Sequence, residues 1–128
     1  MVTFKKARLR RLILDFEVIA FDMLRGGRRT GSRSVRDRRV RAWFGVSLKT
    51  LSKVWDLLTR QFNGRLPEGA TKARFLWALI LSKSYDIEEV NAGRVGGVDE
   101  ATFAEWSLWF VDEIAQLESE VVSFTLVF

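Results

Sequence analysis

The chain has 128 residues, a length typical of one domain, and 48% of them are hydrophobic, which excludes disorder along its whole length. It has no cysteine and no histidine, so disulfide frameworks, zinc fingers and Ser-His or Cys-His catalysis are excluded. Residues 1–41 carry 13 basic and 4 acidic side chains (net +9), and residues 42–128 carry 8 and 12 (net −4), which sum to +5. This asymmetry predicts a polyanionic partner for the basic part.

The first apolar stretch, residues 12–24, is interrupted by Asp15, Glu17 and Asp22. A membrane-spanning helix needs about 20 mostly uncharged residues, and a signal peptide has an uncharged apolar region before its cleavage site. We therefore expect no membrane segment and a soluble intracellular protein.

Helical periodicity dominates the sequence and predicts an all-α bundle of about five helices with short connections. We divide the chain into an N-terminal amphipathic helix (1–24), an arginine-rich linker (25–39), a helical domain (40–122) and an apolar tail (123–128). The linker contains Val35 as its single apolar residue, so we expect it to be flexible.

Within the helical domain, a short aromatic segment (40–45) precedes a helix that we expect to start after the N-cap Ser47 and to end near Phe62. The next helix, about 71–84, is apolar nearly all round and should lie at the centre of the bundle. A shorter helix over about 86–92 and a last helix from Asp99 follow. Trp55, Trp77 and Trp106 lie on apolar stripes and are expected in the core, whereas Trp43, beside the basic run, is a candidate for base stacking.

Residues 86–106 have the layout of a helix-turn-helix, in which Gly96 or Gly97 would supply the turn. An ordinary corner between two helices gives the same pattern. The second helix begins with acidic residues, which phosphates repel, so it should contribute little affinity for DNA. Arg94 and Thr102 are the residues of this unit that we expect at DNA.

The arginine-rich segment is the stronger candidate for affinity, because each arginine that contacts a phosphate releases counterions. A solvated linker, a nuclear-localisation patch and an RNA-binding arm are alternatives. The candidate DNA-binding residues of this segment are Arg25, Arg28, Arg29, Arg33, Arg36, Arg38, Arg39 and Arg41.

No pair of a nucleophile and a base is found, and the paired acids, such as Glu88-Glu89, are typical of solvated helix faces rather than of metal sites. We therefore expect no catalytic residue, no metal and no cofactor.

The order of these segments resembles the N-terminal helical region of Harbinger-type transposases of the DDE endonuclease superfamily. The similarity covers about residues 38–122. It rests on Trp43-Phe44-Gly45, Val54-Trp55, Leu66-Pro67, Leu76-Trp77-Ala78-Leu79, Gly97-Val98-Asp99, Thr102-Phe103, Trp106, Ile114-Ala115 and Leu117-Glu118. The resemblance implies a helix-turn-helix that helps to recognise transposon ends. The family's metal-binding carboxylates have no matching positions here, and Ala104-Glu105 departs from the expected basic character.

These observations predict a nuclear, transposase-derived DNA-binding helical domain without nuclease activity of its own. One alternative is a protein-interaction module that pairs with itself or with a catalytic partner chain. Another alternative is a truncated mobile-element product without a selected function.

Overall fold

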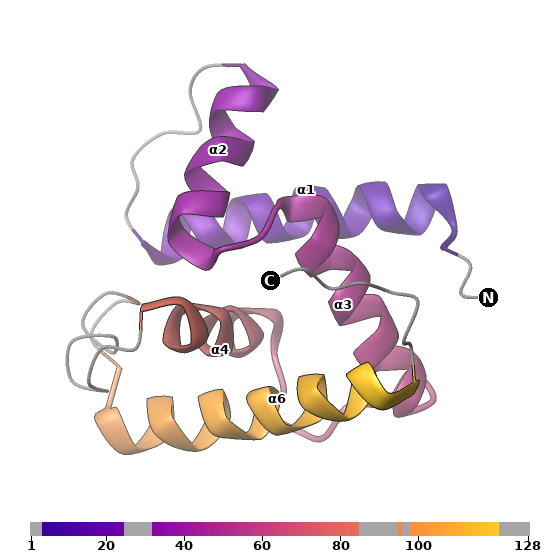
Figure 1. Ribbon diagram of the computed structural model, residues 1–128, viewed down its shortest axis with the longest axis vertical. Coiled ribbons are helices and arrows are strands. Elements are labelled where there is room, and N and C mark those ends of the chain that lie inside the picture. The colour runs from indigo at the N-terminus through magenta and orange to yellow at the C-terminus, as the bar shows by residue number, and fades with distance from the viewer. Residues whose placement is uncertain (1–3, 25–31, 85–94, 96–97, 121–128) are drawn as a thin grey trace.

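The computed structural model describes residues 4–24, 32–84, 95 and 98–120, and within these ranges the chain forms five α-helices and no strand (Figure 1). The predicted all-α fold is confirmed. The helices are α1 (Lys6–Met23), α2 (Arg33–Phe44), α3 (Leu48–Gln61), α4 (Lys72–Ser84) and α6 (Glu100–Glu120). None of these described helices is long and apolar enough to cross a membrane.

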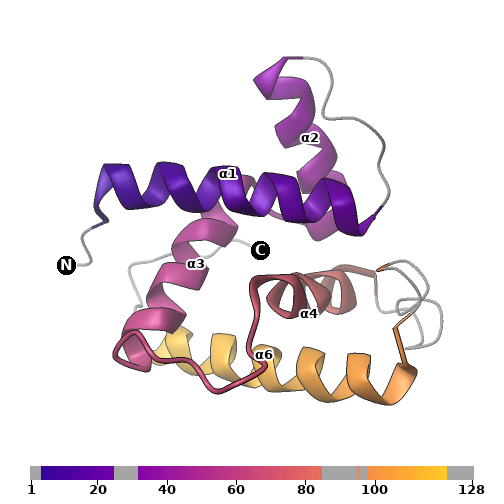
Figure 2. The same cartoon turned by 180° about the vertical axis from the view of Figure 1, so that it is seen from behind.

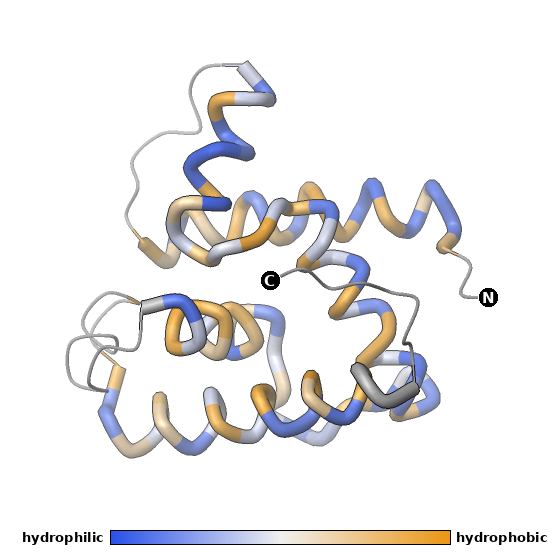
Figure 3. The backbone as a smooth tube through the Cα atoms, viewed as in Figure 1, coloured by the Kyte–Doolittle hydropathy of each residue, from blue (hydrophilic) through white to orange (hydrophobic). Residues whose placement is uncertain are grey.

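The middle of the bundle is formed by α3 and α4. Both contact α1 and α2 on one side and α6 on the other (Figures 1 and 2). In both views α2 and α6 consequently lie at opposite ends of the molecule. As the apolar pattern of α4 predicts, residues 75–80 are all buried. Figure 3 shows α4 mostly in the colour of hydrophobic residues, whereas α2 has long hydrophilic stretches.

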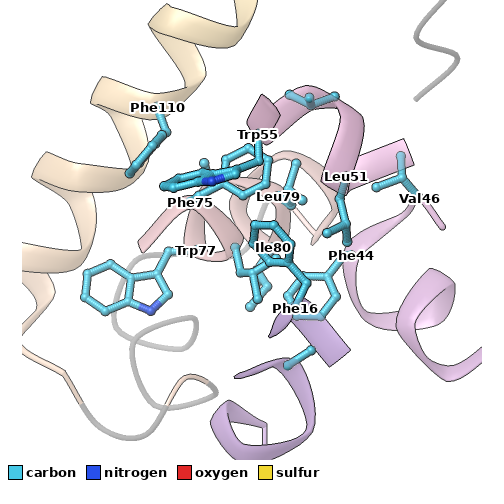
Figure 4. Close-up of a cluster of buried hydrophobic side chains, with 14 of the residues drawn as sticks. Phe16, Phe44, Val46, Leu51, Trp55, Phe75, Trp77, Leu79, Ile80 and Phe110 are labelled. Atoms are coloured by element: carbon cyan, nitrogen blue, oxygen red, sulfur yellow. The ribbon is translucent and has the colours of Figure 1, made fainter. Parts of the chain in front are cut away.

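An aromatic cluster joins four of the helices at the core. The ring of Phe75 on α4 lies 5.7 Å from Phe16 of α1, 5.5 Å from Trp55 of α3 and 5.7 Å from Phe110 of α6 (Figure 4). Tilted and edge-to-face pairs at these centroid distances are favourable beyond the burial of their area. The core therefore ties α1, α3, α4 and α6 into one unit.

The arginine-rich segment differs from its prediction. Residues 25–31 lie outside the described part, but residues 33–39, expected in a flexible linker, form the first two turns of α2. The hydroxyl of Ser32 caps this helix by accepting a hydrogen bond from the Val35 backbone N–H. The helix that precedes α3 therefore begins at Arg33, within the segment expected to be a linker.

The other helix ends follow the sequence closely. The side chain of Ser47 accepts from the Thr50 N–H, which confirms the predicted N-cap of α3. Gly45, between α2 and α3, has φ +82°, a conformation that glycine adopts without strain. The helix expected at 86–92, the turn of the helix-turn-helix and the tail over 123–128 fall outside the described residues, apart from Val95, Val98 and Asp99.

Candidate nucleic-acid interface

The candidate interface is built on α2, which is anchored to the bundle by its C-terminal half. Val40 and Phe44 are its buried side chains. The N-terminal half projects beyond α1 in both views (Figures 1 and 2). Five arginines and one aspartate lie along these twelve residues. The helix therefore presents an array of cations whose spacing is set by the backbone rather than by a flexible chain.

One of the five arginines is used to hold the fold. Arg36 Nε donates to Oε1 of Glu17 on α1 at 3.1 Å, and the Glu17 side chain is buried. A buried carboxylate needs such a partner, because desolvation of an unpaired charge is costly. Arg36 was predicted at DNA, and the structure instead places its guanidinium against α1.

Arg41 is a second paired arginine, but an exposed one. Its Nε donates to Oδ2 of Asp37 at 3.1 Å, one turn earlier on α2, while the arginine side chain remains 64% exposed. Oδ1 of Asp37 accepts from the Leu48 N–H at 3.1 Å and so also caps the start of α3. Exposed pairs of this kind are weak, so Arg41 can exchange this partner for a phosphate.

Arg33, Arg38 and Arg39 are exposed, and none has an ion pair or a side-chain hydrogen bond to any residue that the structure describes. We call these three residues the open arginines. Arg38 and Arg39 lie on the side of α2 opposite to Val40 and Phe44, since 100° of helix separates successive residues. Their guanidinium groups are not neutralised within the described part of the fold.

Beside the open arginines, a groove of about 500 Å³ lies between α1, α2 and the first turn of α3. Arg33, Arg41 and Lys49 line it together with Ser34, Ser47 and Asp37. The three cations and the carboxylate of Asp37, which is paired with Arg41, leave a net positive charge beside the apolar side chains of Ile13 and Leu48. Sequence reasoning missed Lys49; its signal was its position two residues after the N-cap Ser47, next to the basic segment.

The predicted recognition helix has the opposite character. Residues 100–120 contain six acidic residues and no lysine or arginine. Thr102 is held at the start of α6, where Oδ2 of Asp99 accepts from both its backbone N–H and its hydroxyl. Asp99 therefore caps α6, and both donor groups of Thr102 are used in this cap. α6 lies at the end of the molecule away from α2 (Figure 1).

Trp43 lies in a position unlike the one expected for base stacking. It is partly buried, and its ring packs edge-on against Phe21 of α1, with centroids 5.0 Å apart. It therefore fastens α2 to α1. The expectations for Trp55 and Trp77 are confirmed, because both are buried, and Trp106 packs partly buried against the core.

The remaining candidates, Arg25, Arg28, Arg29 and Arg94, lie outside the described residues. Among the residues that are described, no group of three or more acidic side chains is placed to hold a metal ion. Comparisons of the chain with protein-family models, with curated proteins and with solved structures found no match. The resemblance to Harbinger-type transposases accordingly stays a prediction.

Proposed function

We propose that this protein binds the phosphate backbone of nucleic acid through α2. The observation that carries the proposal is the set of open arginines, Arg33, Arg38 and Arg39, exposed on a projecting helix without an anionic partner among the described residues. Arginine forms forked hydrogen bonds with phosphate, and each contact adds affinity through counterion release. Arg41 and Lys49 extend the same surface into the adjoining groove.

Double-stranded DNA is the polymer that this geometry favours. The major groove of B-DNA is about 12 Å wide and admits an α-helix, whereas the deep major groove of duplex RNA is too narrow for side chains to read. The N-terminal end of α2 projects beyond α1 (Figure 2), and the side of the helix that carries the exposed Arg38 and Arg39 can approach a groove. The arginines on its exposed side would then face the flanking phosphates.

The charge distribution supports this orientation. α6 carries six acidic residues and lies at the end of the molecule opposite to α2 (Figure 1). A polyanion attracts one end and repels the other, so the protein approaches DNA with α2 leading. In this proposal α6 stabilises the bundle and does not read bases.

The wider expectations belong to the same proposal. Descent from a Harbinger-type transposase and a nuclear location rest on the resemblance and on the basic segment. The chain would supply DNA binding, and among the described residues no group of carboxylates is placed to hold a metal ion for strand cleavage. Binding without cleavage is the minimal activity that the described surface supports.

The test is a fluorescence-anisotropy titration of mixed-sequence duplex DNA at several salt concentrations. For wild-type protein we expect log Kd to rise with log salt, with a slope of about 0.9 per phosphate contact. The triple variant R33A/R38A/R39A should reduce the slope by about 2.7, the value for three lost contacts. An unchanged slope would remove α2 from the binding surface.

Two controls test the charge of the three arginines and the choice of DNA over RNA. R33K/R38K/R39K keeps the charge, so it should keep most of the salt dependence while losing the forked geometry. A duplex RNA of the same length should bind more weakly than the DNA. Tighter binding to RNA would contradict the groove argument while leaving the role of the arginines intact.

A further inference from the structure

The outer face of α1 carries an exposed apolar pair that the fold does not cover. Leu14 is 59% exposed and Val18 is 47% exposed, and they lie one turn apart on the same side of the helix. In the described part of the chain, one further large hydrophobic residue is exposed to a similar degree, Leu108 on α6. α1 lies on the outside of the bundle, in front of α3 in Figure 2.

Two opposite charges flank this pair on the same stripe. Arg11 precedes Leu14 by three residues, and Asp22 follows Val18 by four, so all four residues share one side of the helix. Both charged side chains are exposed, and neither has an ion pair with any residue described. The stripe therefore runs from basic through apolar to acidic.

The spacing of the stripe is self-complementary. The midpoint of Leu14 and Val18 is position 16, and the midpoint of Arg11 and Asp22 falls half a residue later. A two-fold axis through that point pairs each residue with its counterpart on an antiparallel copy. Leu14 then meets Val18 of the second copy, and Arg11 meets its Asp22, about 8 Å from the axis along the helix.

We propose that α1 is a homodimer interface, in which two copies pack antiparallel through Leu14 and Val18 and are closed at both ends by Arg11–Asp22 pairs. The occupant of the stripe is a second copy of this chain. A parallel arrangement would set Arg11 against Arg11 and Asp22 against Asp22, so charge selects the antiparallel one. The proposal is independent of nucleic acid, because the open arginines lie on α2.

The area of one helix face is small, so the dimer should be weak and visible only at high concentration. Sedimentation velocity without nucleic acid, over a roughly hundredfold concentration range reaching high micromolar, is the suitable measurement. The weight-average mass of the wild type should rise from 14.8 kDa toward twice that value. A wild type that stays monomeric throughout would overturn the proposal.

Variants test the apolar pair against a matched control. L14S/V18S should abolish the rise in mass, whereas L108S removes a leucine of similar exposure on α6 and should behave as the wild type. All of these positions are exposed, so the helical circular-dichroism spectrum should be unchanged. Equal effects of the two variants would contradict a dimer through α1.

Charge exchange tests the orientation. R11D and D22R each create two like-charge contacts and should weaken dimerisation about tenfold. The double variant R11D/D22R restores both pairs with reversed signs and should dimerise as the wild type. A mixture of the two single variants should form the heterodimer in preference to either homodimer. Failure of the double variant to recover would overturn the antiparallel arrangement.

Discussion

Arg36 and Glu17 join α2 to α1 through a 3.1 Å contact in which the arginine Nε donates to a buried carboxylate. This pair attaches the arginine-rich helix α2 to α1. It fixes one guanidinium toward the bundle and thereby holds the rest of the helix in a set orientation, with Arg38 and Arg39 exposed. The basic surface is therefore part of the fold.

Removal of Arg36 should destabilise the protein. R36A takes a partner from the buried Glu17 carboxylate, and we expect a loss of about 3 kcal/mol in the free energy of unfolding, measured by urea denaturation. R41A is the matched control on the same helix, because its pair with Asp37 is exposed, and it should cost less than about 0.5 kcal/mol. Equal losses would show that the buried pair has no special role.

The loop before α4 provides a second prediction. Gly69 has φ +92°, and a Cβ there would lie 2.6 Å from Cζ2 of Trp106. G69A combines left-handed backbone strain with this overlap and should lower the free energy of unfolding by about 3 kcal/mol. Gly64 has φ +82° with nothing within 4 Å, so G64A should cost only about 1 kcal/mol. Thermal unfolding of both variants compares them directly, and a G64A variant as unstable as G69A would refute the overlap.

A third prediction concerns a buried hydroxyl. Ser107 on α6 is fully buried, and its Oγ has no hydrogen-bond partner among the residues that the structure describes. S107A removes the desolvated hydroxyl and should stabilise the protein by about 1 kcal/mol or more. S82A, at an exposed position of α4, is the matched control. It changes only helix propensity and should raise the free energy of unfolding by about 0.5 kcal/mol. A destabilised S107A would mean that the hydroxyl has an interaction in solution.

The capping aspartate between α2 and α3 supplies a fourth prediction. D37A removes both the acceptor for the Leu48 N–H and the partner of Arg41, and we expect a loss of about 1 kcal/mol in chemical denaturation. The same variant removes a carboxylate from the groove beside Arg33 and Lys49. DNA binding should therefore become tighter, and weaker binding would contradict a phosphate site in this groove.

Much of the fold follows from apolar periodicity. α3 was predicted within one or two residues because its apolar side chains repeat at helical spacing and Ser47 marks its start, and α4 because its continuous apolar run fits a central helix. α2 is not predicted from the sequence, which indicates a flexible linker over 25–39 and a short aromatic segment over 40–45. Its first two turns contain a single apolar residue, Val35, so periodicity gives no signal there.

The sequence features that indicate α2 are polar residues rather than apolar periodicity. Ser32 is a suitable N-cap, Asp37 and Arg41 have the spacing of a helical ion pair, and Glu17 occurs within an apolar stretch. The first two are local and could have been read. The contact between Glu17 and Arg36 joins two helices, and a single sequence does not reveal which cation meets a buried acid.

In the candidate site, too, local sequence features were predictable and contacts between helices were not. The sequence located the excess of basic residues but did not distinguish Arg36, which stabilises the fold, from the exposed Arg38 and Arg39. It also missed Lys49, which reaches the groove because α3 begins beside α2. Composition thus predicts a polyanionic partner, while packing decides which of the basic side chains are exposed.

The most direct test of the account compares R38A with R65A in anisotropy titrations with duplex DNA at one low salt concentration. Both arginines are exposed and without an ion pair to any described residue, and both variants lose one charge, but Arg65 lies in the loop after α3. We predict that R38A weakens binding by roughly threefold to tenfold and that R65A leaves it nearly unchanged. Equal effects would contradict a binding surface on α2, and no binding by the wild type would contradict the proposed function itself.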